Sequence, residues 1–324
     1  MKIFIACPAP AHSRKGNRVT ALRWARILKG LGQRVRIARA YDGAACDCCI
    51  ALHARRSHAA VVRFRRLHPE RPLVVALTGT DLYRDIRTDS QAQESLELAD
   101  RLIVLQPQGR DELPARLRDK VRVIFQSAVP AREPASKQDR FFRVCVLGHL
   151  REEKDPFRAA LALHWIPAQS KIRITHAGEA LSRAMAAEAR ALGKQETRYR
   201  WLGEVPRRRA QHILARSKLL VLSSRMEGGA NVVSEALVAG VPVLASRIPG
   251  SEGLLGKDYP GFFPVGDTRA LARLLRRAEL DRDFYNTLLT WCKRLAPLFA
   301  PARERTAWAK LLREFRTAGN RRPG

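Results

Sequence analysis

The sequence predicts an α/β protein with two Rossmann-like domains, each built around a parallel sheet, that face a central ligand cleft. Three observations predict this class. Short apolar runs alternate with segments of helical period, which is typical of doubly wound parallel sheets. The alternation stops at a polar, proline-containing stretch, residues 130–140, and then starts again. The length of 324 residues corresponds to about two domains.

The first domain is expected to cover residues 1–133. Its first strand is the apolar run Lys2–Cys7, and a helix over Val19–Leu31 follows, closed by Gly32. Further apolar runs predict strands over Val35–Ala38, Cys48–Leu52, Leu73–Leu77, Leu102–Leu105 and Val121–Ile124. Helical segments separate most of these runs, so the sheet should be parallel.

The second domain is expected to cover residues 134–298. Predicted strands are Phe142–Leu147, Ile172–Ala177, Tyr199–Leu202, Leu219–Leu222 and Pro242–Ala245. Predicted helices are Pro156–Leu163, Ala180–Leu192, Arg207–Ala215 and Val232–Ala239. Residues 299–324 should contain a C-terminal helix over Ala300–Arg316 that crosses back to the first domain, and a frayed tail from Asn320.

Composition excludes several classes of protein. Hydrophobic residues make up 46% of the chain, which is enough for a sizeable core and excludes a disordered protein. No apolar run approaches the roughly 20 residues of a membrane-spanning helix. The apolar stretch Ile3–Cys7 is too short for a signal peptide. We therefore expect a cytoplasmic protein without membrane insertion.

The net charge of +29 raises the alternative of a nucleic-acid-binding protein. Residues 1–135 carry 25 basic and 13 acidic side chains, and residues 136–324 carry 35 and 18. Nucleic-acid-binding surfaces usually concentrate their positive charge in a stripe or tail. The even spread instead favours solvated helix faces that steer anionic substrates. We expect no nucleic-acid partner.

Cysteine spacing gives no convincing metal site. Cys46-Asp-Cys-Cys49 resembles a metal motif, but no second pair of Cys or His follows at the spacing of zinc ligands. Cys48 and Cys49 run directly into apolar residues, which places at least one of them in a buried strand. Structural thiols are expected, with no metal ion or other cofactor.

The strongest local motif is Glu227-Gly-Gly-Ala-Asn-Val-Val-Ser-Glu235. A loop of small residues before a helix exposes backbone N–H groups that suit a phosphate. Carboxylates beside a phosphate fit hydrogen bonds to neighbouring sugar hydroxyls. Glu235 also fits an ordinary acid in the first turns of a helix, where the helix dipole stabilises it.

This motif resembles the E-x7-E signature of glycosyltransferase family 4, whose members have the two-domain GT-B fold. The resemblance implies that Glu227 contacts the donor sugar and that Glu235 contacts the ribose of a UDP-sugar. The loop would offer backbone N–H groups from Gly228, Gly229, Ala230 and Asn231. The family usually has Phe at the position of Gly229, so this pocket would be more open or differently lined. Gly203-Glu-Val205-Pro206 resembles the loop whose backbone binds the base, which favours uracil.

A second loop, Gly148-His-Leu-Arg-Glu-Glu-Lys154, is similar to the G-R-L-x-x-x-K loop of the family. In the family, an Arg and a Lys neutralise the diphosphate leaving group. Lys154 keeps the Lys position, whereas His149 replaces the Arg. Arg151 and Arg225 are candidates for the missing guanidinium. His149 also fits a neutral strand-end histidine, and Lys154 a solvated lysine.

The first domain is expected to hold the acceptor. The basic loop 13–20 joins the first strand to the first helix and suits an anion. Two further strand ends, residues 53–58 and 78–83, should point into the same cleft. The cations on these loops are Arg14, Lys15, Arg18, Arg55 and Arg56. Arginine binds phosphate oxygens with two parallel hydrogen bonds, so a phosphate-like acceptor fits. Two or three of these side chains fit solvated arginines equally well.

The resemblance is closer than the family level and extends over nearly the whole chain to the selenosugar synthases. It rests on Pro8–Pro10, Gly16–Arg26, Ala51–Ala60, Val75–Asp85, Val146–Arg158, Ser223–Asn231 and Tyr259–Asp267. The resemblance implies transfer of a hexosyl group from UDP-N-acetylglucosamine or UDP-glucose to selenophosphate, with loss of UDP and phosphate.

The site residues implied by this resemblance fall into three groups. The catalytic group is Lys154, His149 and Glu227. The donor group adds Gly148, Arg151 and Val205 to the residues of the Glu227–Glu235 motif. The selenophosphate group is Gly16, Asn17, Arg18, Thr20, Arg55, Arg56, Thr80 and Asp81.

Some alternatives stay open at this point. Selenium is already an anionic nucleophile, so it needs little help from a general base, although Asp81 or His53 could serve. Donor preference, retention or inversion at the anomeric carbon, and oligomeric state stay open. The competing functions are a conventional UDP-sugar glycosyltransferase with a sugar, lipid or cell-wall acceptor, and a basic nucleic-acid-binding protein without turnover.

Overall fold

The structure is a computed structural model that describes residues 1–13, 16–129 and 140–319. The predicted linker, residues 130–140, falls outside these ranges except for Arg140. Arg14, Lys15 and the tail from Asn320 fall outside them too. The chain folds into two compact units. The first unit comprises Met1–Gln126, Glu227–Gly229 and Pro301–Gly324, and the second comprises Ser127–Met226 and Ala230–Ala300.

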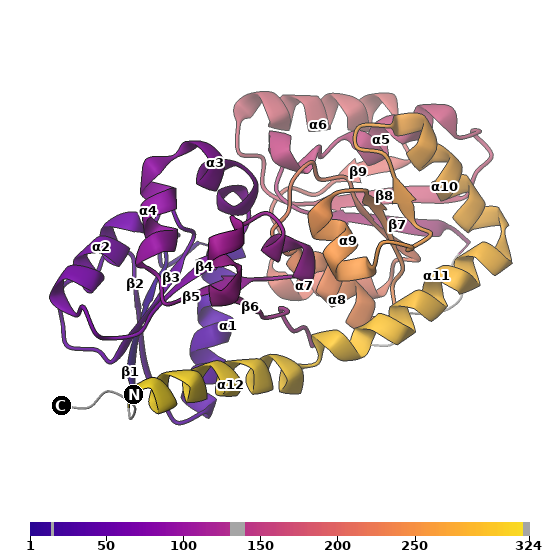
Figure 1. Cartoon of the computed structure of the whole chain (residues 1–324). Coiled ribbons are helices and arrows are strands. Elements are labelled where there is room, and N and C mark those ends of the chain that lie inside the picture. The colour runs from indigo at the N-terminus through magenta and orange to yellow at the C-terminus, as the bar shows by residue number, and fades with distance from the viewer. Residues whose placement is uncertain (14–15, 130–139, 320–324) are drawn as a thin grey trace. The chain divides into compact units, whose positions relative to one another are not determined.

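The first unit contains a six-stranded parallel sheet (Figure 1). Its strands are β1 (Lys2–Ala6), β2 (Arg34–Ala38), β3 (Cys48–Leu52), β4 (Leu73–Leu77), β5 (Arg101–Val104) and β6 (Val121–Val123). Their order is β2-β1-β3-β4-β5-β6, and in the register of β1 and β3 Ile5 pairs with Ile50. β3 and β4 are buried along their whole length, as expected for strands that helices cover on both faces.

Alternate side chains of these strands enter two different cores, one on each face of the sheet. Ile5 and Ile50 pack with α1 (Gly16–Gly30) and α12 (Pro301–Gly319). Phe4 and Leu77 pack on the other face with α2 (His58–Leu67) and α4 (Ser90–Leu98). The unit also contains a π-helical turn, η1 (Asp81–Asp85), the short helix α3 (Ile86–Thr88), and the 3-10 helices η2 (Pro107–Arg110) and η3 (Ala115–Lys120).

The second unit contains another six-stranded parallel sheet, in the order β12-β11-β10-β7-β8-β9. Its strands are β7 (Phe142–Leu147), β8 (Ile172–Ala177), β9 (Tyr199–Trp201), β10 (Leu219–Leu222), β11 (Val243–Ser246) and β12 (Phe262–Phe263). Its α-helices are α5 (Arg158–Ala162), α6 (Arg183–Gln195), α7 (Arg207–Ala215), α8 (Asn231–Val238), α9 (Pro249–Leu255), α10 (Thr268–Leu280) and α11 (Arg282–Leu295). The 3-10 turns are η4 (Glu152–Lys154), η5 (Leu163–Trp165) and η6 (Ala296–Phe299).

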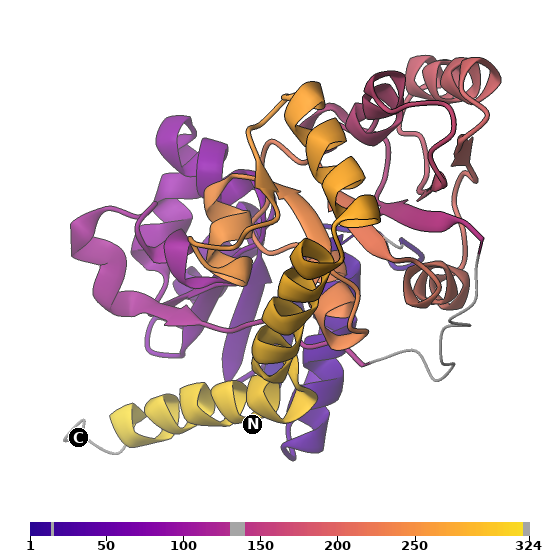
Figure 2. The same cartoon turned by 90° about the vertical axis from the view of Figure 1, so that its right-hand side faces the viewer.

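Side-chain caps explain where several helices of this unit begin. Figure 2 shows the corner between α10 and α11, where one residue ends a helix and starts the next. The Asp281 N–H donates to the carbonyl of Arg277, and its carboxylate accepts the N–H of Phe284 at 2.9 Å. Ser182 caps α6 in the same way by accepting the N–H of Met185.

The two parallel sheets confirm the predicted α/β fold class. The predicted bounds of β3, β4, β7, β8 and β10 match those of the structure. Gly32 ends α1 with a φ of 79°, in the left-handed region that glycine adopts without strain. The elements that were not predicted include the two-residue strand β12, the helices α9 and α11, and the turn η1. Cys48 and Cys49 both lie buried in β3, and all six cysteines are buried thiols.

Helix α12 lies beside α1 within the first unit (Figure 1 and Figure 2). Buried hydrogen bonds and apolar packing fix it there. Trp308 packs against Trp24 of α1, with the ring centroids 4.9 Å apart. The buried carboxylate of Glu304 accepts hydrogen bonds from Trp24 Nε1 at 2.8 Å and from Arg23 Nε at 3.2 Å. If this carboxylate were removed, the N–H groups of Trp24 and Arg23 would each lose this hydrogen bond in a buried contact.

Glu304→Ala should therefore destabilise the first unit. We expect its free energy of unfolding to fall by about 2–3 kcal/mol, since hydrogen bonds to buried charged groups are lost. Urea unfolding followed by circular dichroism measures this change. The control is Arg303→Ala, an exposed neighbour on the same helix turn. If both variants unfold at the urea concentration of the parent, Glu304 does not hold α12 in place.

Candidate functional site

In the second unit, the loops after three neighbouring strands, β7, β8 and β9, lie very close together. The N–H of Gly148 donates to Ala177 at 3.0 Å, and the N–H of Gly178 donates to Gly203 at 2.8 Å. A Cβ atom on Gly178 would lie 1.8 Å from the carbonyl oxygen of Gly148. Only glycine can stand at position 178 while the loops keep this spacing.

His149 stands in the first of these loops as a half-buried side chain. Its Nδ1 accepts the backbone N–H of Glu179 at 3.2 Å. Burial lowers the pKa of His149, so the imidazole is neutral at pH 7. A neutral ring that accepts at Nδ1 carries its proton on Nε2. At the position of the family's arginine, His149 therefore offers one N–H donor and no positive charge. Its contact with the diphosphate stays a prediction.

Lys154 ends the turn η4, whose backbone the neighbouring loop holds. The Ser223 hydroxyl, directly after β10, lies 3.2 Å from the carbonyl oxygen of Lys154 and 2.7 Å from that of Asp155, and it donates to them. Asp155 has a φ of 43°, in the left-handed region that is uncommon for residues other than glycine. Its carboxylate binds Arg158 at 2.8 Å. These contacts fix the main chain from which the Lys154 ammonium extends.

Arg151 and Arg225 were the candidates for the missing guanidinium. The side chain of Arg225 is exposed, and its backbone N–H donates to Glu153 at 2.8 Å. Arg151 has a buried Nε that makes no hydrogen bond to any part of the chain that the structure describes. The Glu153 carboxylate lies 4.0 Å from this atom. A buried donor without a partner suits an anionic ligand, so the geometry favours Arg151.

The remaining donor-side residues fall in three places. Ala230 and Asn231 open helix α8, and Glu235 lies on the same helix, where its carboxylate pairs with Arg207 of α7 at 3.2 Å. Val205 is half-buried in the loop between β9 and α7. The structure groups Glu227, Gly228 and Gly229 with the first unit, and Glu227 is buried there.

In the first unit, His53 follows β3 with a φ of 73°, a strained conformation for this residue type. Its buried Nδ1 accepts the N–H of Arg56 at 3.3 Å, and its Nε2 lies 3.2 Å from the Thr80 hydroxyl. Burial lowers the pKa of His53, so this ring too is neutral and carries its proton on Nε2. His53 and Thr80 thus lie together at the carboxyl ends of β3 and β4.

Asp81 is fully buried, and its carboxylate lies 3.9 Å from Nδ1 of His53. Its carboxylate accepts the backbone N–H groups of Ala54 at 3.0 Å, Thr78 at 3.0 Å and Gly79 at 2.8 Å. These bonds use the carboxylate to fix the turn between β4 and η1. The geometry therefore assigns Asp81 a role in the fold. Its role as an acceptor ligand or general base stays a prediction.

Arg55 and Arg56 differ in how they are held. Arg55 Nε binds the buried carboxylate of Asp85 at 3.0 Å and lies 4.0 Å from Asp89. Arg56 is exposed. Asp85 was not among the predicted site residues, although it stands four positions after Asp81, one helical turn later.

The start of α1 carries the other predicted acceptor residues. Gly16 and Asn17 open the helix, with Gly16 exposed and Asn17 half-buried. Arg18 Nε donates to the carbonyl of Ala11 at 3.1 Å, which closes the loop before the helix. Thr20 is buried and its hydroxyl accepts a hydrogen bond from Gln126 at 2.7 Å. Thr20 is therefore packed inside the unit, and its binding of selenophosphate stays a prediction.

The sequence of the second half is similar to that of a known family. Residues 130–289 match the family model for glycosyl transferases group 1. The interlocked glycine loops, His149, Lys154 and α8 all lie within the matched residues. A comparison with curated proteins finds no match.

Solved structures identify the fold of the chain as GT-B. Anabaena HepE in complex with UDP and glucose superposes with a TM-score of 0.78 at 17% identity, covering 97% of this chain and 100% of HepE. Sucrose-phosphate synthase from Thermosynechococcus elongatus gives 0.76 at 16% identity, covering 98% and 99%. A Rickettsia africae glycosyltransferase gives 0.73 at 12% identity, covering 97% and 98%.

Two residues of the donor loops were missed by sequence reasoning. Gly178 comes directly after a predicted strand, and a glycine at such a place indicates a close approach of backbones. His176 is one of three polar residues of the run Ile172–Ala177, and a polar residue that lies buried within a strand needs a hydrogen-bond partner. Both signals are visible in the sequence without the structure.

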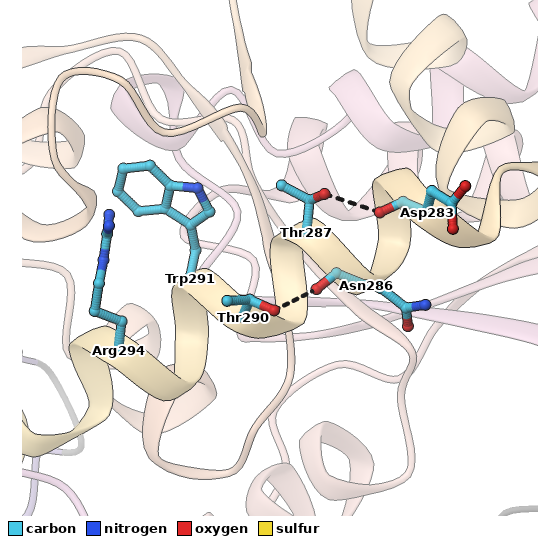
Figure 3. Close-up of a pocket in the computed structure, with 6 residues that line it drawn as sticks. All are labelled: Asp283, Asn286, Thr287, Thr290, Trp291 and Arg294. Atoms are coloured by element: carbon cyan, nitrogen blue, oxygen red, sulfur yellow. Dashed lines mark hydrogen bonds between the residues drawn. The ribbon is translucent and has the colours of Figure 1, made fainter.

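A surface hollow lies along α11, away from these loops (Figure 3). It measures about 410 Å³ and is lined by Asp283, Asn286, Thr287, Thr290, Trp291 and Arg294. Its hydroxyls are already bonded to their own helix, Thr287 to Asp283 at 2.9 Å and Thr290 to Asn286 at 3.0 Å. Because its polar groups serve the helix, we assign the hollow no role in transfer.

The residues that the structure describes lack two features, a cluster of metal ligands and a membrane-spanning helix. In these parts of the chain, no three His, Cys, Asp or Glu side chains come together as a metal ion would require. In the same residues, no helix combines the length and the apolar character needed to cross a bilayer.

Proposed function

We propose that this chain is a selenosugar synthase of the SenB type. It transfers a hexosyl group from UDP-N-acetylglucosamine or UDP-glucose to selenophosphate, in the biosynthesis of selenoneine. Glycosyl transfer is supported by the group 1 match, which covers the Lys154 turn and the start of α8. The UDP-sugar donor is supported by HepE, which was solved in complex with UDP-glucose. Selenophosphate is supported by the resemblance to the selenosugar synthases over nearly the whole sequence.

The observation that carries the donor assignment is the Gly148–Lys154 loop, which neighbouring segments of the second unit hold in place. One flexible cation, Lys154, stands on a turn that Ser223 holds, and it would balance the charge that develops on the departing UDP. His149 Nε2–H and the unpartnered Nε of Arg151 add donors for diphosphate oxygens. Glu227 would contact the sugar and Glu235 the ribose.

Between heavy atoms, the proposed reaction forms two bonds, carbon–selenium and phosphorus–oxygen, and breaks two. A selenium lone pair of selenophosphate attacks the anomeric carbon, and the bond from that carbon to the UDP oxygen breaks with its electrons leaving on UDP. Water then cleaves the selenium–phosphorus bond, giving phosphate and the 1-selenosugar. Because the nucleophile arrives as an anion, the attack requires no proton removal.

The proposed reaction uses no metal ion, because Lys154 supplies the positive charge next to the diphosphate. EDTA should therefore leave the rate of UDP release unchanged.

The proposed acceptor site uses the strand ends of the first unit. Arg55 is held by Asp85, so its guanidinium has a defined position, and Arg56 beside it is exposed to solvent. Gly16 and Asn17 add the N-terminus of α1, where backbone N–H groups favour an anion. Thr80 completes the set, while Thr20 and Asp81 stay in the fold for the reasons given above.

One observation favours a second candidate, a glycosyltransferase with a lipid-linked acceptor. A hollow of about 450 Å³ lies between α1 and β2, lined by Leu22, Ala25, Arg26, Lys29, Val35 and Ile37. Leu22 is a large apolar side chain that is half exposed there. Apolar side chains next to two cations are typical of surfaces that lie on anionic lipid.

Turnover with each UDP-sugar, with and without selenophosphate, separates the two candidates. We expect UDP release that depends on selenophosphate, and a product with the mass of the selenosugar.

Arg55→Ala with Arg56→Ala should raise the KM for selenophosphate roughly 10-fold or more and leave the affinity for UDP unchanged. Arg66→Ala on α2, also exposed, is the control.

Absence of selenium-dependent UDP release with both sugars would exclude the selenosugar synthase. UDP release that requires a lipid extract instead would favour the second candidate. If the double variant keeps the parent affinity for selenophosphate, these arginines are not the acceptor site.

A further inference from the structure

His176 is a fully buried imidazole in β8 that the proposed reaction does not use. Its Nδ1 lies 3.0 Å from the hydroxyl of Tyr199, on the adjacent strand β9. Its Nε2 lies 3.2 Å from the carbonyl oxygen of Gly148, the residue that precedes His149. One buried ring therefore joins the neighbouring strand to the first residue of the donor loop.

The partners of His176 determine where its proton lies. The carbonyl oxygen of Gly148 can only accept, so Nε2 must carry a hydrogen. Burial lowers the pKa of His176 to about 4, so the ring is neutral at pH 7 and its Nδ1 accepts from Tyr199. The Tyr199 hydroxyl thus selects the tautomer that can hold the Gly148 carbonyl.

The neighbouring loop after β8, which contacts the Gly148 loop, is fixed as well. Trp201 Nε1, at the end of β9, donates to the carbonyl of Gly178 at 2.9 Å. The backbone N–H of Glu179 donates to His149, and its carbonyl accepts the N–H of Leu150 at 2.8 Å. The ring of His149 therefore takes its direction from a segment that His176, Trp201 and Gly178 hold in place.

We propose that His176, with Tyr199 as its partner, is a positioning residue for the donor site. It holds the Gly148 carbonyl so that Nε2–H of His149 is aimed at the diphosphate of the nucleotide. This role rests on the proposed UDP-sugar donor. In this arrangement two neutral histidines act in series, one buried and one facing the ligand, and neither contributes charge.

Tyr199→Phe tests the role with the smallest change. Without the hydroxyl, the Nδ1–H tautomer of His176 competes and the hydrogen bond to Gly148 is lost in part. We expect the Kd for UDP to rise roughly 5- to 10-fold, the change that corresponds to one hydrogen bond. The matched control is Tyr285→Phe, which removes a hydroxyl bonded to the carbonyl of Lys218 at 3.1 Å in the same unit. The control should leave the Kd for UDP unchanged.

A second measurement does not depend on any ligand. Nitrogen-15 spectra of the histidine rings should show His176 and His149 as neutral Nε2–H tautomers at pH 7. In Tyr199→Phe the His176 signal should shift toward the Nδ1–H form. His176→Gln retains an N–H donor and should preserve UDP binding better than His176→Phe, which retains none.

Each result supports or overturns the role. Equal UDP affinities in Tyr199→Phe and Tyr285→Phe, or an Nδ1–H tautomer of His176 in the parent, would overturn it while the glycosyltransferase proposal stands. Failure of the parent protein to bind UDP at all would overturn the proposed function and, with it, this role. The ring spectra then still show whether the hydrogen bond to Gly148 exists.

Discussion

Lys154→Ala should lower kcat roughly 100- to 1,000-fold, the loss typical when one group that stabilises transition-state charge is removed. The charge on the departing UDP grows as the bond to the anomeric carbon breaks. His149 is neutral, so it donates one hydrogen bond and cannot balance that charge. The Gly148–Lys154 loop has two cations, Arg151 and Lys154, and we expect Lys154 to balance most of the charge on the departing UDP. Steady-state UDP release with saturating substrates measures the effect.

Two controls accompany this variant. Lys154→Arg keeps the charge on a longer, planar group and should recover part of the rate. Lys171→Ala removes an exposed lysine of the same unit and should behave as the parent. If Lys154→Ala retains kcat within threefold of the parent, the leaving-group charge is balanced elsewhere, and Arg151 becomes the first residue to replace.

The contrast between predicted and missed elements has a physical origin. β3, β4 and β10 are buried along their whole length, so they read as continuous apolar runs. β7 and β8 contain polar residues, but each still buries several apolar side chains that mark it as a strand. The strand β12 has two residues, which is too short for any periodicity. The turn η1 starts at Asp81, whose carboxylate binds three backbone N–H groups, and only the folded chain brings those groups together.

The candidate site divides in the same way. Lys154 could be predicted because the spacing of its loop resembles that of a known family. The charge of His149 could not, because it depends on burial and on a backbone N–H from position 179, thirty residues later. Thr20 and Asp81 were chosen for their place at strand and helix ends. Residue type and place do not show whether a side chain points outward or bonds inside the unit.

Gly178→Ala should produce the other large effect. The added methyl group would meet the carbonyl carbon of Gly148 at 2.4 Å and its oxygen at 1.8 Å, so the two backbones must separate. This separation stretches the hydrogen bonds that hold Gly148 and His149. It also forces the backbone to shift in a close-packed region, which costs free energy. We expect a loss of more than about 3 kcal/mol in the free energy of unfolding, together with a rise of at least roughly 10-fold in the Kd for UDP.

Gly193→Ala is the matched control for this experiment, because the same methyl group is added where there is room. Gly193 lies in helix α6 of the same unit, and a Cβ there would meet its nearest neighbour, the carbonyl oxygen of Tyr199, at 3.8 Å. Alanine in a helix is favoured over glycine, so this variant should gain about 0.5–1 kcal/mol and bind UDP as the parent does. Opposite changes in stability from one chemical substitution would show that the approach of the β7 and β8 loops, and no general sensitivity of the unit, excludes a side chain at position 178. A Gly178→Ala protein with parent stability and parent UDP affinity would mean that the two loops are farther apart than the structure places them.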